Sequence, residues 1–205
     1  MYKMPYYTVT DSPEIEAFLH EYPFAMLCGV LSDKPVATHV PLQVSVREGR
    51  FILTGHIMNG TDHHQAFLVN NRVLAIFHGP HSYVSASCYP RKQRASTWNY
   101  MDVQAHGTLH FTDEAETLNI LKEITNQYES AESEASFERL PDEYVQRMAR
   151  LVSGFHIEVD RIEGVFKLSQ QDDKETRKQI ISYLIKQDDA NAHAVAKEME
   201  KRIDK

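Results

Sequence analysis

The strongest constraint on the fold is a series of six stretches in which apolar and polar residues alternate. The clearest stretch runs from Asn99 to Phe111, where Met101 and Val103 alternate with Asp102 and Gln104. Successive side chains of a β-strand point to opposite faces, so this alternation indicates half-buried strands. Short turns join most of the stretches, which is the pattern of an antiparallel barrel. The six predicted strands cover residues 24–31, 35–46, 50–57, 73–89, 99–111 and 154–169.

The second predicted strand is a single run from Pro35 to Val46. Its even-numbered residues, from Val36 onward, share one face, and its odd-numbered residues share the other. The three residues Arg47–Gly49 then form a hairpin turn into the third strand.

Helical signals separate these strands. Ser12 is predicted to cap a first helix, Pro13 fits its first turn, and Pro23 ends it. After the fifth strand, Asp113 with Glu116 forms an N-terminal capping pair for another helix. Shorter helices are predicted over residues 61–69 and 144–151. The predicted apolar stripes are Ile15, Phe18 and Leu19 in the first helix, and Leu118, Leu121, Ile124 and Tyr128 in the helix after Asp113.

The C-terminal part of the chain has the apolar period of helices rather than strands. We therefore predict two domains, a barrel domain over residues 1–170 and a C-terminal helical appendage over residues 171–205. The apolar positions that mark the two terminal helices are Ile180, Ile181, Leu184 and Ile185 in one, and Val195, Met199 and Ile203 in the other.

The composition, 205 residues with 42% hydrophobic and 25% charged, is that of a soluble globular protein. The longest apolar run, Phe24–Leu31, is too short to cross a bilayer, and no signal peptide is visible. Cys28 and Cys88 lack CxxC spacing, which indicates buried thiols and a cytoplasmic protein. The net charge of −7 and the missing basic recognition helix argue against specific DNA binding without a partner.

An unusual polar face lies at the end of the fourth predicted strand. From His81 to Tyr89 it carries hydroxyls, phenols and an imidazole, where solvent-facing strands usually carry Lys, Glu and Arg. A planar, neutral ligand needs hydrogen-bonding edges of this kind together with an aromatic surface. The alternative is that these groups only hold the barrel turns together. Similar groups are Thr38, His39, Thr54 and His56, and TWNY (Thr97–Tyr100) holds the only tryptophan; RKQR (Arg91–Arg94) would add cations for a phosphate tail.

Several familiar motifs are absent from the sequence. It contains no GxGxxG, P-loop, GxSxG, HExxH or zinc-finger spacing. The adjacent pair His63 and His64 diverges on a helix, and His78 and His81 converge only if the intervening Gly-Pro turns the chain. We therefore predict no dedicated metal site. No carboxylate pair or activated nucleophile stands out to define a reaction.

Six sequence blocks together resemble a known family. In chain order they are PVATHVPL, LTGHI, LAIFHGPHSYVSASCYP, STWNY, VQAHG and FKLSQ, the last from Phe166 to Gln170. They are similar to the PaiB-type FMN-binding negative transcriptional regulators, a branch of the pyridoxamine-phosphate-oxidase-like proteins. The resemblance implies an α+β, mainly β fold, an antiparallel six-stranded split β-barrel with peripheral helices and a C-terminal helical pair. It also implies a cytoplasmic homodimer that binds FMN at the subunit interface.

The resemblance assigns residues to the flavin site. Thr38, His39 and Val40 would run along the flavin ring, and Thr54, Gly55 and His56 would lie near the phosphate and ribityl chain. Trp98 and Asn99 would close the pocket. A second wall would come from residues 167–170, including Lys167, Ser169 and Gln170.

The chain also departs from the family pattern. After GHI the family reads Asn-Pro-His/Gln-Trp, whereas this chain has Thr61, Asp62, His63 and His64 a few residues on. Three interpretations therefore stay open. The first is an FMN-binding regulator, and the second is an enzyme, either a flavin-dependent oxidoreductase or a haem-handling protein of the same fold. The third is a dimeric binding module that has lost its cofactor.

Overall fold

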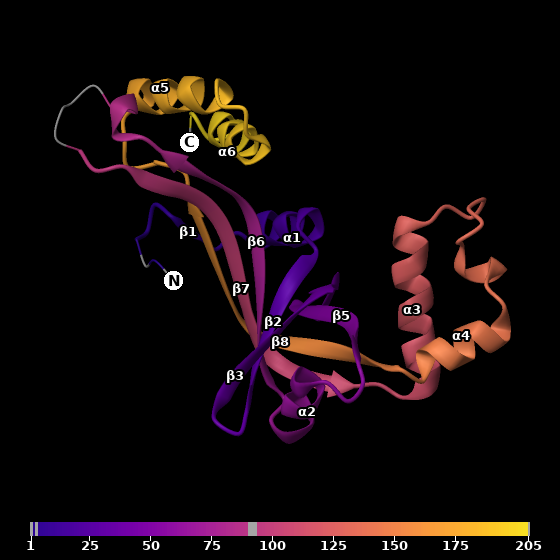
Figure 1. Cartoon of the computed structure of the whole chain (residues 1–205). Helices are drawn as coiled ribbons and strands as arrows, with labels where there is room; N and C mark the ends of the chain where they lie inside the picture. Colours follow the sequence, from indigo (N-terminus) through magenta and orange to yellow (C-terminus); the bar gives the residue numbers. More distant parts are fainter. Residues whose placement is uncertain (1, 3, 90–93, 205) are drawn as a thin grey trace. The chain divides into compact units, whose positions relative to one another are not determined.

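A computed structural model describes residues 2, 4–89 and 94–204 of the chain (Figure 1). Over these residues the protein is a mixed α+β fold with one eight-stranded sheet and six α-helices. The strands are β1 (Thr8–Val9), β2 (Phe24–Leu31), β3 (Lys34–Pro41), β4 (Gln43–Arg47), β5 (Arg50–Met58), β6 (Arg72–Val84), β7 (Thr97–Phe111) and β8 (Val152–Lys167). The helices are α1 (Ser12–Glu21), α2 (Asp62–Val69), α3 (Glu114–Tyr128), α4 (Asp142–Ala149), α5 (Lys174–Ile185) and α6 (Ala190–Glu200).

The sheet order is β3-β2-β6-β7-β8-β5-β4, and β1 pairs with β8 beside this path. The pairs β2–β3, β2–β6, β4–β5, β5–β8 and β1–β8 are antiparallel. The predicted antiparallel, mixed α+β class is therefore confirmed. The strand count was wrong, because β1 was missed and the run from Pro35 to Val46 forms two strands.

The chain divides into two compact units. The first unit contains residues 1–18, 78–103 and 163–205, and the second contains residues 19–77 and 104–162. Strands β6, β7 and β8 each contribute residues to both units. Helices α5 and α6 belong to the first unit together with the ends of these strands, and the predicted domain boundary after Gln170 stays a prediction.

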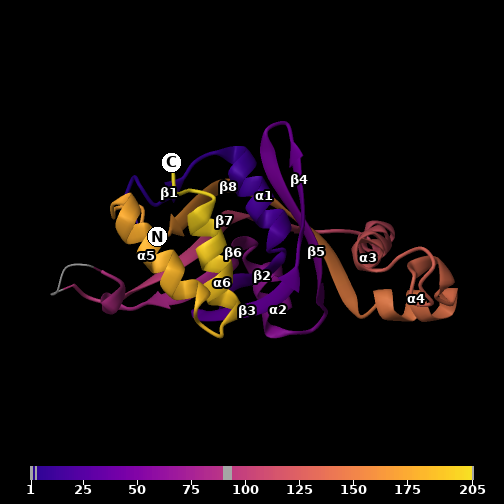
Figure 2. The same ribbon diagram turned by 90° about the horizontal axis from the view of Figure 1, so that it is seen from above.

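In the first unit, α5 and α6 lie side by side (Figures 1 and 2). The apolar positions that predicted these helices are buried, except Ile185, which is exposed, and Ile203, which follows α6 and is partly buried. Asp173 caps α5 by accepting a hydrogen bond of 2.8 Å from the Thr176 amide. From α1, Phe18 reaches the Phe166 ring of β8 at a centroid distance of 5.1 Å. The predicted cap of α1 was one residue off, since the Asp11 carboxylate accepts from the Glu14 amide.

In the second unit, the run predicted as one strand breaks at Leu42. The Leu42 side chain is buried, and its amide donates to the carbonyl of Pro23 at 2.9 Å, in register with the β2–β3 pairing. From Gln43 onward the chain pairs with β5 instead of β2. The predicted hairpin is confirmed, because β4 and β5 pair through Arg47 and Arg50. Glu48 and Gly49 both have positive φ, 51° and 77°, which suits a two-residue hairpin turn.

Helices α2 and α3 of the second unit begin where the sequence predicts. The Thr61 and Asp113 side chains cap them by accepting from the His64 and Glu116 amides. The predicted stripe of α3 was partly wrong. Its buried residues are Thr117, Ile120 and Ile124, whereas Tyr128 is exposed and Leu118 and Leu121 are only partly buried. Helix α4 lies beside α3 (Figure 1).

Glycine allows a close strand contact in the second unit. A Cβ atom at Gly107 of β7 would lie 2.4 Å from the Glu158 carbonyl oxygen and 2.7 Å from Cγ2 of Ile157, both on β8. These distances are shorter than van der Waals contact allows. Only glycine therefore permits the backbones of β7 and β8 to approach in this way.

The burial alternation of β6 changes phase in the middle of the strand. Odd-numbered residues from Val73 to Gly79 are buried, and then the even-numbered residues Pro80, Ser82 and Val84 are buried. Such a shift is the effect of one extra residue in a strand, as in a β-bulge. A Cβ atom at Gly79 would lie 2.7 Å from the Phe18 ring, so glycine at the shift lets α1 pack closely. The strand ends at Val84, and Ser85 instead caps a 3₁₀ turn, so the predicted alternation to Tyr89 was wrong.

Candidate functional site

Lys167, at the end of β8, is a buried cation in the first unit, only 9% exposed. Its Nζ atom donates to Oγ1 of Thr97 and to the backbone carbonyl of Trp98, each at 2.5 Å. Burial lowers the pKa of Lys167, and the nearby Asp172 carboxylate partly opposes this effect. The ammonium group thus ties the end of β8 to the beginning of β7.

Asn99 and Ser169 form a second link between β7 and the residues after β8. The Ser169 hydroxyl donates to Oδ1 of Asn99 at 3.1 Å, and Nδ2 of Asn99 lies 3.4 Å from the sulfur of Met199 on α6. Both polar side chains are almost fully buried. Ser169 has a φ of 62°, a left-handed conformation that is uncommon for residues other than glycine. The backbone turn at Ser169 is therefore held by side-chain contacts.

Gln170 completes this region of the first unit. Its side-chain carbonyl accepts from the Leu168 amide at 2.7 Å, and its side-chain amide donates to the carbonyl of Phe166. Both bonds are local, so Gln170 closes the turn that follows β8. The predicted group of Trp98, Asn99, Lys167, Ser169 and Gln170 is thus brought together by β7, β8 and the turn after β8.

An ion pair holds the residues next to this turn. Arg94, the only residue of the predicted RKQR segment that the structure describes, pairs with the buried Asp172 carboxylate and lies 4.8 Å from the Tyr89 ring. The Tyr7 hydroxyl donates to Gln171 at 2.6 Å. Burial, with several nearby acidic groups, raises the pKa of Tyr7 to about 12, so its hydroxyl keeps its proton.

Exposed aromatic rings lie on the outer side of β6 and β7 in the first unit. Trp98 is 54% exposed and Tyr83 is 47% exposed, and their ring centroids are 6.0 Å apart in an edge-to-face arrangement. The centroid of the His81 ring lies 6.2 Å from the centroid of the Trp98 ring. The predicted polar face that carries His81 and Tyr83 is thus present up to Val84. The ring of Trp98, the only tryptophan, lies beside it.

In the second unit, Thr38, His39 and Val40 follow one another on β3, an edge strand of the sheet. The alternation along this strand separates their side chains. Val40 is buried and Thr38 is partly buried, whereas His39 is exposed and stacks on Phe24 with centroids 5.7 Å apart. Only His39 therefore offers a freely accessible polar group.

Thr54 of β5 belongs to a hydrogen-bonded chain that the sequence did not reveal. Its hydroxyl lies 2.9 Å from Nδ1 of His156 on β8, and Nε2 of His156 lies 3.3 Å from a carboxylate oxygen of Glu116 on α3. The chain lines a pocket of about 260 Å³. Finding it from sequence would require the register that pairs Thr54 with His156, 102 residues away.

Gly55 and His56 face different surroundings on β5. A Cβ atom at Gly55 would lie 2.9 Å from Leu42 and 3.0 Å from Phe155, so Gly55 supports core packing. Nδ1 of His56 is buried and has no hydrogen-bond partner among the described residues. Burial lowers the pKa of His56, which favours the neutral ring. A buried, unpaired ring nitrogen is a plausible contact for a polar ligand group.

The segment Thr61–His64, which departs from the family pattern, stabilises the first turn of α2. Thr61 caps α2, and its hydroxyl also lies 3.0 Å from Nε2 of His63. The Asp62 carboxylate accepts from the His63 amide at 2.7 Å. Asp62 and the two histidines are therefore engaged in local contacts around the first turn of α2.

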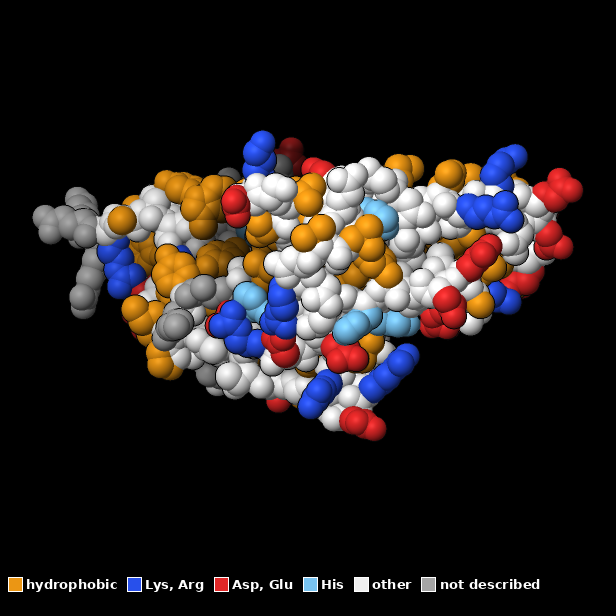
Figure 3. Space-filling model, turned by 90° about the horizontal axis from the view of Figure 1, so that it is seen from below, with side chains coloured by type: hydrophobic (Ala, Val, Ile, Leu, Met, Phe, Trp, Pro, Cys, Tyr) orange, Lys and Arg blue, Asp and Glu red, His pale blue; other side chains and the backbone are white. Residues whose placement is uncertain are grey.

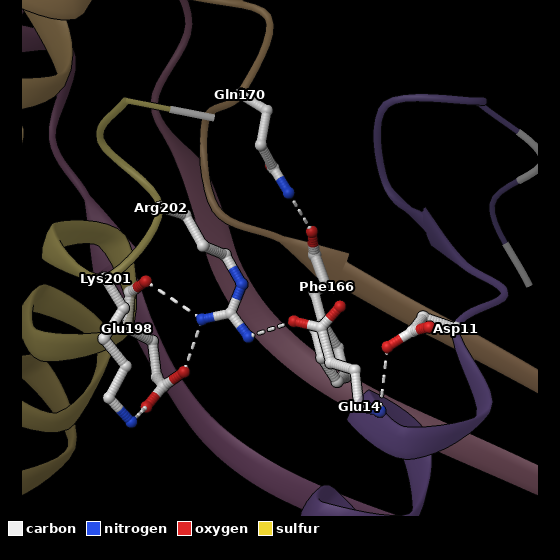
Figure 4. Close-up of polar contacts among 7 residues, drawn as sticks. All are labelled: Asp11, Glu14, Phe166, Gln170, Glu198, Lys201 and Arg202. Carbon is white, nitrogen blue, oxygen red and sulfur yellow. Dashed lines mark hydrogen bonds and ion pairs between the residues drawn. The ribbon is translucent and has the colours of Figure 1, made fainter.

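A further polar network of the first unit centres on Arg202, after α6 (Figure 4). Its guanidinium donates to Glu198 at 2.5 Å and to Glu14 of α1 at 2.6 Å, and it lies over the Phe166 ring at 5.3 Å. Lys201 also donates to Glu198 at 2.5 Å. Arg202, Glu14 and Phe166 line a pocket of about 350 Å³ together with Tyr6, Tyr7, Thr8, Val9 and Gln170. This network could not be predicted from the sequence, because its members lie up to 188 residues apart.

Within residues 2, 4–89 and 94–204, no helix is long and apolar enough to span a membrane. The same residues contain no group of three or more His, Cys, Asp or Glu side chains arranged to hold a metal ion.

Solved structures share this fold at low sequence identity. The flavocytochrome Anf3 from Azotobacter vinelandii aligns with 81% of this chain and 72% of its own, with 15% identity and a TM-score of 0.62. The FAD and heme binding protein from Mycobacterium smegmatis aligns with 78% of this chain and 73% of its own, with 16% identity and a TM-score of 0.59. At these identities the likeness concerns the fold alone.

Sequence comparisons give the family. The protease synthase and sporulation protein PAI 2 of Bacillus subtilis (strain 168) is 30% identical over 206 residues, covering 100% of this chain and 99% of that protein. Residues 1–161 match the family described as "Putative FMN-binding domain". The resemblance found in the sequence is confirmed, and the chain belongs to this FMN-binding domain family.

Proposed function

We propose that the protein is a homodimeric split barrel that binds FMN and acts as a negative transcriptional regulator. The family match over residues 1–161 and the full-length similarity to PAI 2 support the proposal. The structural observation that carries it is the meeting of a buried hydrogen-bonding network around the Lys167 ammonium and an aromatic surface at Trp98. Nζ of Lys167 binds the Trp98 carbonyl, and the Trp98 ring is exposed beside Tyr83.

The available groups fit the chemistry of a flavin. An isoalloxazine ring needs an apolar or aromatic surface and hydrogen bonds at its polar edge. Trp98 and Tyr83 offer the surface, and the Lys167 ammonium, which has three N–H groups and bonds Thr97 and Trp98 with two of them, offers a donor. In the second unit, the unpaired Nδ1 of His56 is a further candidate contact. When bound, FMN would supply electron transfer, and the residues of the chain would position it and exclude water.

FMN is expected to quench the fluorescence of Trp98, because a flavin close to an indole quenches it by stacking or energy transfer. Trp98 is the only tryptophan, so the emission reports on one ring. Calorimetry should show that Trp98→Ala weakens FMN binding by about 1–2 kcal/mol. Thr54→Val should cost about 1 kcal/mol if its hydroxyl also contacts the ligand.

The matched control is Lys197→Ala on the exposed side of α6, which should leave FMN affinity unchanged. Absence of saturable quenching at high micromolar FMN would count against flavin binding. Unchanged affinity in both variants would show that the ligand is right and the assigned residues are wrong. The same titration with haemin, read as a Soret band, separates the haem-handling alternative from flavin binding.

The homodimer is expected to survive dilution to micromolar concentration. Large apolar side chains such as Phe24, Tyr83 and Trp98 are exposed on the single chain, and pairing of two copies is a common way to cover such surface. Light scattering should give twice the mass of one chain. A stable mass of a single chain across the concentration range would contradict the dimer.

Regulation is expected to depend on a partner rather than on direct DNA recognition. The net charge is −7, and on the face drawn in Figure 3 basic and acidic side chains are interspersed. Neutralisation of phosphates by a basic surface supplies much of the affinity for DNA. A mobility-shift experiment at physiological salt should show no sequence-dependent, submicromolar complex, and the appearance of such a complex would overturn this expectation.

A further inference from the structure

We infer that His78 and His81 form a binding site for a divalent late transition-metal ion. Of this class of ions, Cu²⁺ binds most tightly. The two rings meet on β6 of the first unit, with Nε2 of His78 only 2.9 Å from Nδ1 of His81. Their ring centroids are 4.6 Å apart. The side chain of His78 is 52% exposed, so an ion reaches the pair from solvent. The proposed metal site does not depend on whether the protein binds FMN.

The change of phase in β6 creates this pair. Residues three apart on a regular strand point to opposite faces. The shift at Gly79 and Pro80, both buried, returns His81 to the side of His78. The pair therefore rests on a feature of the packed backbone. The sequence left this convergence open and predicted no metal site because a lone histidine pair of this kind is usually structural or solvated.

The distance between the two nitrogens suits one metal ion. Imidazole nitrogens bind Zn²⁺ at about 2.0–2.1 Å, so two ligands on one ion lie roughly 3.0–3.4 Å apart. The observed 2.9 Å requires the rings to separate by only a few tenths of an ångström. At present one ring donates its N–H to the other, and Nδ1 of His81 also lies 3.4 Å from the Gly79 carbonyl. To bind a metal ion, both facing nitrogens must be free of protons, so the proton between the rings moves to the outer nitrogen of its own ring, Nδ1 of His78 or Nε2 of His81.

Asp102 positions His78 for this role. Its Oδ1 atom lies 3.6 Å from Nδ1 of His78, on the opposite side of the ring from the proposed ion, and the residue is 8% exposed. Metal-binding histidines commonly direct their second nitrogen toward a carboxylate, which fixes the tautomer and makes the ring a better ligand. The negative charge also favours a cation at the pair. Asp102 is thus a positioning residue.

The ligand set selects the class of ion. Imidazole nitrogen suits Cu²⁺, Ni²⁺ and Zn²⁺, and affinity for a given site is highest for Cu²⁺ in this series. Because the described residues hold no group of three protein ligands, water would complete the coordination shell. Mg²⁺ is a hard cation that prefers oxygen ligands, so the two imidazole nitrogens bind it poorly.

Trp98 provides a local reporter for the test. Its ring lies 6.2 Å from the His81 ring, so a bound Cu²⁺ ion quenches the only tryptophan. Untagged full-length protein is titrated with Cu²⁺, and saturable quenching is expected. His78→Gln and His81→Gln should each weaken binding by about tenfold or more, and Asp102→Asn should weaken it by about tenfold. Zn²⁺, which quenches weakly and binds less tightly than Cu²⁺, should restore the emission only when added in large excess.

The matched controls are His110→Gln, at an exposed position of β7, and His63→Gln, in the adjacent histidine pair of α2. Both controls should leave the titration unchanged, and circular dichroism checks that each variant is folded. Electron paramagnetic resonance of the Cu²⁺ complex should show coupling to two imidazole nitrogens, reduced to one in His78→Gln and in His81→Gln. Equal quenching in the wild-type chain and both glutamine variants, or a spectrum without imidazole nitrogen, overturns the site.

Discussion

Replacing Arg202 with methionine is expected to lower the free energy of unfolding by about 3 kcal/mol, the lower end of the scale for removing one partner of a buried ion pair. The side chains of Arg202 and Glu198 are only 16% and 7% exposed, and Glu14 completes the group (Figure 4). Methionine preserves packing on Phe166 but leaves the Glu198 carboxylate with Lys201 as its remaining cation. Chemical denaturation of the full chain measures the difference.

The matched control is Lys174→Met, which removes an exposed ion pair with Asp204. Exposed pairs contribute about 0–1 kcal/mol, so the control should change little. An equal loss in both variants would contradict a special role for Arg202.

The same network makes the free energy of unfolding decrease as the solution becomes acidic. Burial alone would raise the pKa of Glu198, but hydrogen bonds and charges from Lys201 and Arg202 outweigh it and lower the pKa. A carboxyl group whose pKa is lowered on folding stabilises the fold above its unfolded pKa, and this contribution is lost as the pH falls through the folded value. The wild-type chain should therefore lose more stability between neutral and acid pH than Arg202→Met.

Gly107→Ala is expected to lower the free energy of unfolding by about 3 kcal/mol, the upper part of the usual range for overpacking. The new Cβ atom would meet the Glu158 carbonyl at 2.4 Å, and a backbone atom cannot move aside as a flexible side chain can. β7 and β8 must therefore separate locally. Urea unfolding and the thermal midpoint measure the loss.

Gly164→Ala on β8 is the matched control, because its Cβ atom would come no closer than 3.2 Å to Val9. Its loss should be about 1 kcal/mol or less. If Gly107→Ala is as stable as the wild-type chain, the close approach of β7 and β8 at Gly107 is wrong.

Local signals predicted much of the fold. Asp113 and Thr61 cap helices because their side chains replace missing backbone partners, and this rule needs only neighbouring residues. The strands beginning at Phe24 and Arg50 follow from alternation alone. The break at Leu42 could not be predicted in this way, since its amide binds the Pro23 carbonyl, 19 residues earlier.

The candidate site was predictable to a smaller extent. Residues near one another in sequence, such as Lys167 and Gln170, lie together because they belong to one strand end and its turn, and their assignment to a flavin site stays a prediction. His156 and Arg202 were missed because their partners depend on strand register and on where the last helix packs. The convergence of His78 with His81 was left open for the same reason, since only packing fixes the shift in β6.

The phase shift in β6 also has a consequence for comparing this chain with its relatives. Which side chains reach the surface after Pro80 depends on the number of residues before them, and not only on their identity. A relative of equal length whose strand lacks the shift would keep a recognisable sequence block while turning the equivalents of His81 and Tyr83 inward. A relative lacking one residue between His78 and His81 would instead lose the shift and keep both equivalents on the exposed face. Alignments of the family are best anchored here by burial pattern before residue types are compared.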